Sequence, residues 1–329
     1  MKSSLKIGLL SYRSNPHCGG QGVYIRHLSQ ALCDLGHQVE VIAGPPDPQL
    51  NGHGKLTMLK TLDLYNPDDL FRTPRLAELS DMINLLEWLD VSAMGYPEPW
   101  TFGMRVVRHL KGKETRYDII HDNQSLSYGL LSLMKKVPVT ATIHHPMTVD
   151  RRLAVQSTRS FIKKIKALRW YSFIHMQKKV ARQLPKILTV SDISKQDIAK
   201  EFAIPDTRFT TIANGIDTKS FYPMDTVTKI EGRIIVTNSA DTPLKGLYHL
   251  LYAIKNIVKK RRIFLVVIGT PKKNGGIERL IKQLDLGSHI EFTGRISHHR
   301  FVREYAKASI AVVPSLYEGF GLPVGEAMA

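Results

Sequence analysis

Two glutamates near the end of the sequence enclose a loop whose residue types suit a sugar phosphate. Glu318 and Glu326 are separated by seven residues, which include Gly319, Gly321, Gly325 and a proline. Glycines leave backbone N–H groups open to a phosphate. A carboxylate one turn into the expected helix offers two acceptor oxygens to a ribose diol. Either glutamate alone is more simply explained as an acid at a helix terminus or on the surface. The hypothesis of a sugar-phosphate site therefore rests on the whole pattern.

A second glycine loop lies near the start of the chain. Gly19, Gly20 and Gly22 fall between an expected strand and an expected helix, where backbone N–H groups and the helix dipole favour an anion. In the dinucleotide-binding fingerprint the glycines follow the strand directly, whereas here Arg13–Cys18 intervene. A nicotinamide-cofactor enzyme is therefore not favoured, and a turn that needs glycine geometry remains the alternative to a phosphate loop.

The elements that must position these loops alternate between strand and helix. Short apolar runs are followed by segments of helical spacing, which predicts an α/β fold with parallel, doubly wound sheets. We expect two domains, residues 1–217 and 218–329, with a long, partly irregular insertion between Leu50 and Trp100. Because Val324–Ala329 looks like the start of a helix and the second domain is small, we expect its C-terminal part to be absent from this sequence.

Composition limits the class of protein. Hydrophobic residues make up 43 % and charged residues 23 %, as in soluble packed proteins. The two cysteines are too few for a disulfide framework, which indicates a reducing compartment such as the cytoplasm. No apolar stretch is long enough to span a membrane, and the first residues read as a strand and not as a signal peptide.

Basic charge is concentrated in one segment. The chain has 46 Lys and Arg against 29 Asp and Glu, a net charge of +17, and residues 151–186 hold eleven Lys and Arg and no acid. Apolar residues recur there at helical spacing: Phe161, Ile165, Leu168, Tyr171 and Ile174. A basic amphipathic helix fits peripheral docking on the anionic inner face of a membrane. The alternative is a helix whose apolar residues pack in the hydrophobic core and whose charged residues are simply solvated. Nucleic acid is not an expected partner, since no recognised motif accompanies the charge.

Taken together, the motifs resemble glycosyltransferase family four, a retaining family with the GT-B fold. The resemblance runs from Lys6 to Ala329 and is carried by Gly19-Gly20, Asn214-Gly215-Ile216-Asp217, Lys245-Gly246 and the E-x7-E signature. It implies two Rossmann-like domains facing a cleft, with the acceptor on the N-terminal side and the nucleotide sugar on the incomplete C-terminal domain. It also implies a metal-independent enzyme without a cofactor, whose nucleotide-diphosphate sugar is a substrate. No Asp-x-Asp metal motif occurs in the chain.

The resemblance assigns roles to matching positions. Lys245 would neutralise the departing diphosphate, Glu318 would bind the transferred sugar, and Glu326 would bind the ribose. The residues expected to act in catalysis are Glu318, Lys245, His121 and Asn123. The residues expected to bind the donor are Gly19, Gly20, Gly22, Lys245, Gly319, Phe320, Gly321, Leu322 and Glu326.

Two departures from the family pattern bear on these roles. Ala240 stands where the family usually has an arginine five residues before its lysine, which weakens the expected grip on the diphosphate. Asn123 stands where the family often has a histidine, two residues after His121. His144 and His145, at an expected strand end, are further candidates, and a hydrogen-bonded turn is the alternative for them.

The expected function is transfer of a sugar from a nucleotide-diphosphate donor to a hydroxyl of a sugar or lipid-linked acceptor, with the anomeric configuration retained. In this family the leaving phosphate is the favoured acceptor of the proton, so no strong protein base is expected. Two alternatives stay open. A nucleotide-sugar epimerase or hydrolase on the same fold would need an acid–base pair from the histidines. A degenerate, non-catalytic relative would bind a membrane surface without using a nucleotide.

Overall fold

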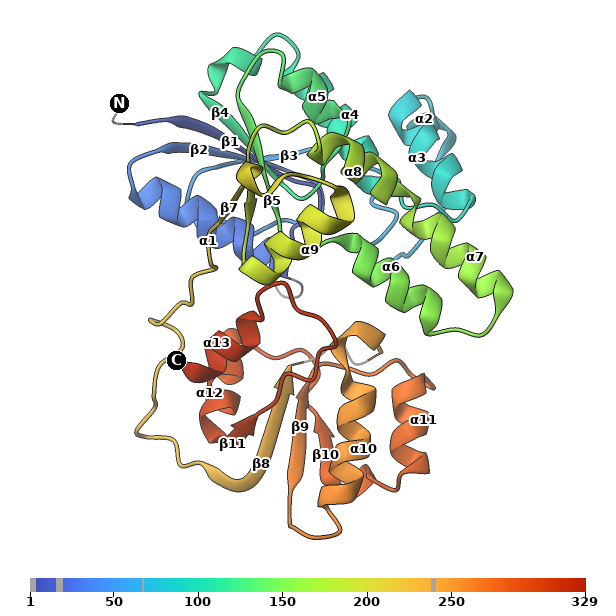
Figure 1. Cartoon of the computed structure of the whole chain (residues 1–329), viewed down its shortest axis with the longest axis vertical. Helices are drawn as coiled ribbons and strands as arrows, with labels where there is room; N and C mark the ends of the chain where they lie inside the picture. Colours follow the sequence, from blue (N-terminus) through green and yellow to red (C-terminus); the bar gives the residue numbers. More distant parts are fainter. Residues whose placement is uncertain (1–3, 16–19, 67, 238–240) are drawn as a thin grey trace. The chain divides into compact units, whose positions relative to one another are not determined.

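The protein consists of two compact α/β units. The computed structural model describes residues 4–15, 20–66, 68–237 and 241–329. The units are Met1–Ala213 and Asn214–Ala329. Each unit contains a parallel sheet flanked by helices (Figure 1). The α/β class predicted from alternating strands and helices is therefore confirmed.

The first unit is built on a seven-stranded sheet in the order β3-β2-β1-β4-β5-β6-β7. Its strands are β1 (Lys6–Ser11), β2 (Gln38–Ala43), β3 (Lys55–Met58), β4 (Ile119–Asn123), β5 (Val139–Ile143), β6 (Ile187–Thr189) and β7 (Phe209–Thr211). Its helices are α1 (Gly20–Asp34), α2 (Leu76–Leu79), α3 (Met82–Ser92), α4 (Glu98–Leu110), α5 (Gly129–Leu133), α6 (Met147–Gln156), α7 (Phe161–Trp170), α8 (Ile174–Ala181) and α9 (Asp192–Phe202).

Both faces of this sheet are covered, which explains the continuous apolar runs of its strands. Side chains alternate along a strand, so Leu9 of β1 packs with Ile25 of α1 while Leu10 packs with Phe102 of α4. Every strand pair is parallel, so the carboxyl ends of β1, β4 and β5 lie along one edge of the sheet.

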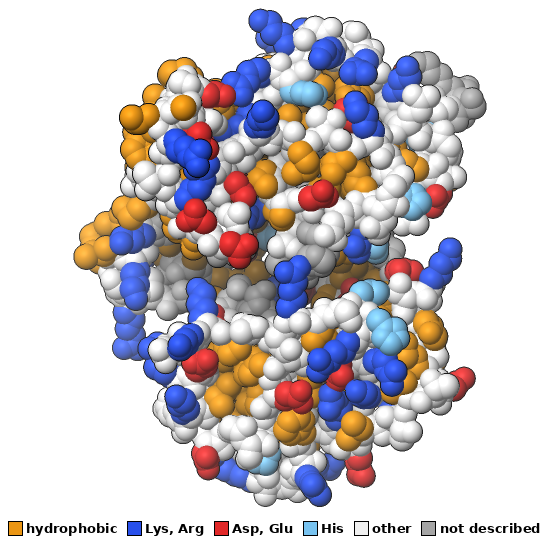
Figure 2. Space-filling model, turned by 180° about the vertical axis from the view of Figure 1, so that it is seen from behind, with side chains coloured by type: hydrophobic (Ala, Val, Ile, Leu, Met, Phe, Trp, Pro, Cys, Tyr) orange, Lys and Arg blue, Asp and Glu red, His pale blue; other side chains and the backbone are white. Residues whose placement is uncertain are grey.

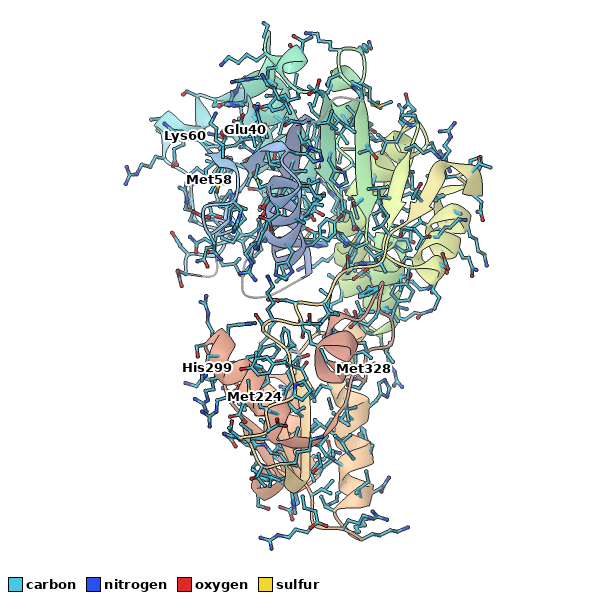
Figure 3. The ribbon with its side chains drawn as sticks, turned by 90° about the vertical axis from the view of Figure 1, so that its left-hand side faces the viewer. Glu40, Met58, Lys60, Met224, His299 and Met328 are labelled. Carbon is cyan, nitrogen blue, oxygen red and sulfur yellow. The ribbon has the colours of Figure 1, made fainter. Side chains whose placement is uncertain are left out.

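The segment from Leu50 to Trp100 is more regular than the sequence predicted. It supplies edge strand β3 and helices α2 and α3, where a partly irregular insertion was expected. The spacing of apolar residues does not predict these helices well, because two of the buried positions of α3 and α4 are charged. Glu87 and Arg105 form a buried ion pair where an apolar residue would otherwise indicate the buried face of a helix. Glu40 and Met58, labelled in Figure 3, mark β2 and β3 at this edge of the sheet.

The second unit has a four-stranded sheet in the order β10-β9-β8-β11. Its strands are β8 (Ile230–Thr237), β9 (Phe264–Ile268), β10 (Ile290–Phe292) and β11 (Ala308–Ala311). Its helices are α10 (Leu247–Ile257), α11 (Gly276–Gln283), α12 (His298–Lys307) and α13 (Leu322–Met328). Helices α10 and α11 form one hydrophobic core with β8 and β9. His299 in α12 and Met328 in α13 are labelled in Figure 3.

Residues 214–217 pack with the second unit, whereas the sequence prediction assigned them to the first domain. A side chain at Gly325 of α13 would come within 2.5 Å of Ile216 Cδ1, so Ile216 lies directly against this helix. Phe221 is buried against the rings of His298, Phe301 and Tyr305. These contacts tie the start of the second unit to α12 and α13.

The basic segment forms successive helices and not one long helix. Helix α6 is followed by a break at residues 157–160, then by α7, a short 3-10 turn (Tyr171–Phe173) and α8. The apolar stripe predicted from sequence divides between two environments. Ile174 of α8 is buried, but no residue of α7 is buried. Within the described part of the chain, the helices are too short or too polar to cross a membrane.

Candidate functional site

Residues 312–321, called the donor loop after their predicted role, follow β11. A 3-10 turn (Pro243–Lys245) precedes α10 in the loop after β8. Strands β8 and β11 are adjacent and parallel, so both loops lie at the carboxyl edge of the sheet, where α/β proteins bind ligands. The backbone N–H of Leu316 donates to the carbonyl of Leu244 at 2.8 Å. This bond holds the two loops together.

The structure brings together the lysine and the first glutamate of the predicted donor site. Lys245 Nζ lies 2.7 Å from Glu318 Oε1, and both side chains are about one-third exposed. The Ser315 hydroxyl donates to the same carboxylate oxygen at 2.6 Å. A cation and an oriented carboxylate are therefore presented at the sheet edge, 73 residues apart in sequence.

A glycine is required where the two loops meet. Gly246 has φ +68°, and a Cβ at this position would lie 1.9 Å from the carbonyl oxygen of Pro314. Gly321, with φ +81°, precedes the first residue of α13 in the left-handed region that favours glycine. The predicted donor-binding residues Gly319, Phe320 and Gly321 thus lie between Glu318 and α13, and Leu322 begins the helix.

Glu326 lies in α13 and is half-buried. Burial raises the pKa of its carboxyl to about 7. The same carboxyl, together with burial, raises the pKa of Tyr305 above its ordinary value, so the two side chains are close in space. A half-buried acid with such a pKa is a common feature of ligand sites.

The first unit contains a second polar cluster, at the carboxyl ends of β1, β4 and β5. The Asn123 amide donates to the backbone carbonyl of Gln21 at 3.2 Å and to the Ser11 hydroxyl at 3.4 Å. Its Oδ1 lies 2.8 Å from His144 Nε2, and the Tyr24 ring packs edge-on against that imidazole. Asn123 thus links the end of β1, the first turn of α1 and the end of β5.

His121 is enclosed beneath this cluster. Its Nε2 lies 2.9 Å from the Thr142 hydroxyl, which lies 2.9 Å from the Tyr24 hydroxyl. Burial lowers the pKa of His121 to about 4 and that of His144 to about 3, so both imidazoles are neutral near pH 7. His121 therefore orients Tyr24 through Thr142, and neither histidine is a cation at neutral pH.

The predicted glycines at the start of α1 differ in their surroundings. A Cβ on Gly22 would come within 2.0 Å of the Asn15 carbonyl oxygen, so this glycine lets the helix approach the preceding loop closely. A Cβ on Gly20 would meet nothing within 4 Å, which leaves its backbone accessible. Gly19 and Ala240 lie outside the described residues.

The loop after β5 is a hydrogen-bonded turn, which was the alternative weighed for its histidines. The Gln124 side chain accepts from the His144 N–H at 2.7 Å and donates to the His145 carbonyl at 3.0 Å. The His145 imidazole pairs with Asp150 at 2.8 Å. Sequence reasoning missed Ser315 and Tyr24, because isolated hydroxyls outside a motif carry no sequence signal. Among the described residues, no three His, Cys, Asp or Glu side chains are grouped so as to hold a metal ion.

Comparison with known proteins identifies the class. The sucrose-phosphate synthase of Thermosynechococcus elongatus has a similar structure, with a TM-score of 0.72 and 21 % identity over 98 % of this chain and 79 % of that chain. The fold is the GT-B fold of glycosyltransferases. The model of Glycosyltransferase Family 4 matches residues 18–220, and that of Glycosyl transferases group 1 matches residues 224–329.

Relatives agree with this class. The MMP alpha-(1->4)-mannosyltransferase of Mycolicibacterium hassiacum is 44 % identical over 99 % of this chain and 79 % of its own length. A D-inositol 3-phosphate glycosyltransferase of Catenulispora acidiphila is 24 % identical over 98 % of this chain and 77 % of its own length. The chain belongs to glycosyltransferase family 4, and the resemblance read from its motifs is confirmed.

Proposed function

We propose that this glycosyltransferase moves mannose from a nucleotide-diphosphate donor to an acceptor hydroxyl and retains the anomeric configuration. The observation that carries the proposal is the Lys245–Glu318 contact of 2.7 Å, which presents a cation for a diphosphate beside a carboxylate for a sugar. We propose mannose as the transferred sugar, and α-(1→4) as the linkage formed, from the name of the relative that is 44 % identical.

In the proposed reaction the second unit binds the donor. Lys245 stabilises the charge that develops on the leaving diphosphate, so a side chain supplies the positive charge and no metal or cofactor is needed. Glu318 binds a hydroxyl of the transferred sugar, and Glu326 accepts hydrogen bonds from the ribose diol. The acceptor attacks on the face that the diphosphate leaves, and the departing phosphate oxygen takes the acceptor's proton. Burial lowers the pKa of His121 to about 4 and that of His144 to about 3, which makes both imidazoles weak bases and agrees with a reaction that needs no protein base.

The first unit is the proposed acceptor side. The accessible backbone at Gly20 lies beside the carboxyl ends of its strands, where an acceptor sugar or the donor diphosphate can be bound. Asn123 itself is fully buried, and its amide is fixed by bonds to Gln21, Ser11 and His144, so its proposed role is to position the first turn of α1 and His144.

A nucleotide screen tests the donor site. A ligand bound only to the folded state at ~100 Kd adds about 2.7 kcal/mol of stability, so thermal unfolding should report binding clearly. We expect one of UDP, GDP, ADP or their mannose derivatives to raise the melting temperature. The Glu326→Ala variant should lose that rise, while Glu291→Ala, at an exposed glutamate of β10 in the same unit, should keep it. No rise with any nucleotide would contradict the proposal.

The α7 surface supports a further proposal, that the enzyme works at the cytoplasmic face of a membrane on a lipid-linked acceptor. Four apolar side chains of this helix are 47–75 % exposed: Phe161, Ile162, Ile165 and Leu168. Lysines flank them within a segment of eleven Lys and Arg and no acid. Figure 2 shows hydrophobic beside basic side chains at the left edge of the molecule, where α7 lies. An anionic lipid surface satisfies both properties.

Vesicle sedimentation tests the membrane proposal. The protein should bind vesicles that contain phosphatidylserine at low salt and leave them as salt rises, because exposed charges are screened. Replacing Ile165 and Leu168 by serine should abolish binding. The matched control replaces Leu76 and Met82, which are also exposed in the first unit but lie outside the basic segment. Failure of the unmodified protein to bind would contradict the proposal.

A further inference from the structure

The Glu318 carboxylate has two hydrogen-bond donors on one oxygen. Lys245 Nζ lies 2.7 Å and Ser315 Oγ 2.6 Å from Glu318 Oε1. Both donors come from side chains of the two loops that meet at this sheet edge. Ser315 belongs to none of the motif positions identified in the sequence.

The position of Ser315 is fixed by the backbone around it. The next residue, Leu316, donates its N–H to Leu244 at 2.8 Å. The preceding carbonyl, of Pro314, is so close to Gly246 that a Cβ there would lie 1.9 Å away. The backbone of Ser315 is therefore held by contacts on both sides with the turn that carries Lys245, and neither contact involves the lysine side chain.

Donor binding changes what the lysine pairs with. In the structure the Lys245 ammonium pairs with the Glu318 carboxylate. A nucleotide diphosphate brings several negative charges to the same loop edge and competes for the ammonium, which is a flexible point charge on a four-carbon stem. When Lys245 turns to the diphosphate, Glu318 loses a charged partner just as it must present its carboxylate to the sugar.

We propose that Ser315 is a positioning residue. Its hydroxyl holds the Glu318 carboxylate in place when the Lys245 ammonium leaves that carboxylate and pairs with the donor diphosphate. This inference rests on the proposed function and adds a step to it. Ser315 acts through Glu318, so it affects the transfer step more than nucleotide binding. An exchange of this kind also explains why a lysine and not an arginine occupies position 245, since a bidentate arginine–carboxylate pair would release less readily.

Steady-state kinetics of Ser315→Ala and Ser315→Thr test the proposal, with the nucleotide sugar that gives transfer as donor. Loss of a hydrogen bond to a charged group in the transition state lowers kcat by about 10- to 100-fold. We expect that loss in Ser315→Ala, with the Kd for the nucleoside diphosphate alone, from titration calorimetry, within about threefold of the parent. Ser315→Thr, which restores the hydroxyl, should recover most of kcat.

Controls separate positioning from folding. Ser309→Ala removes another hydroxyl of the same unit, which donates to the Ile230 carbonyl at 2.6 Å, and should leave kcat unchanged. In a Glu318→Gln background, Ser315→Ala should cost little more, because both changes act on one group. Additive losses, equal losses of kcat and nucleotide affinity, or a parent-like kcat in Ser315→Ala would overturn the proposal. An unmodified protein that transfers no sugar would instead contradict the proposed function.

Discussion

Replacing Gly246 by alanine should disable the donor site through one added methyl group. Gly246 has φ +68°, and its Cβ would lie 1.9 Å from the Pro314 carbonyl oxygen and 2.7 Å from the carbonyl carbon. Atoms at such distances overlap, so the donor loop must move away from the turn that carries Lys245. The movement would separate Ser315 and Glu318 from the lysine, although none of these side chains is altered.

Two magnitudes follow from this geometry. The left-handed backbone costs an alanine roughly 1–2 kcal/mol, which lowers the melting temperature of a unit this size by about 4–8 °C. Restoring an ordinary contact between Cβ and the oxygen requires a shift of the loop by roughly 1.5 Å, and a misplacement of about 1 Å already lowers kcat/KM by about 100-fold. The loss of activity should therefore exceed what the loss of stability explains.

Gly36→Ala provides the matched control. Gly36 has φ +84°, but an added Cβ there meets nothing within 4 Å. This variant should lose stability of the same order and keep its kcat/KM, as measured by melting and by sugar transfer at a temperature where both variants are folded. A Gly246→Ala variant with the kcat/KM of the unmodified protein would refute the argument that this contact positions the donor loop.

Three further predictions concern buried charge. The pKa of His121 is lowered to about 4 from 6.5, so between these pH values the unfolded chain binds a proton that the folded chain does not, and this one group lowers the stability by about 1.4 kcal/mol for each pH unit from 6.5 toward 4; His121→Gln should remove that contribution from the pH dependence measured by urea titration. The pKa of Glu326 is raised to about 7, so calorimetry should find donor affinity about tenfold weaker at pH 6 than at pH 8, and Glu326→Gln should remove the dependence. Arg105→Leu should destabilise the protein to urea by about 3–5 kcal/mol, because Glu87 stays buried and unpaired, and adding Glu87→Leu should restore most of the loss.

Strong hydrophobic runs made most of the fold predictable, and buried polar residues set the limit. The runs at Lys6–Ser11 and Phe264–Ile268 are apolar because both faces of their sheets are covered. The region of α3 could not be read in this way, since its buried positions include Glu87. Helical spacing predicted α7 as a helix but could not show whether its apolar side chains are buried in the core. In the folded protein, Phe161 of this helix is exposed.

The candidate site was predictable where it rests on motifs and unpredictable where it rests on packing. Lys245 and Glu318 came from a family pattern, and their contact across 73 residues needed the fold. Thr142 reaches His121 because β4 and β5 pair in a particular register, which no local pattern of residues specifies. Ser315 is one serine among many until its hydroxyl is seen on the Glu318 carboxylate.

The anomeric configuration of the glycosidic linkage formed tests directly whether the protein is a retaining mannosyltransferase. The protein is incubated with α-configured nucleotide mannoses and a mannose oligosaccharide acceptor. The configuration of the new linkage is then assigned by nuclear magnetic resonance. We expect transfer of mannose with an α linkage, and we expect Lys245→Ala and Glu318→Ala to abolish this transfer. A β linkage would contradict retention, and release of free mannose without a new linkage would contradict transfer.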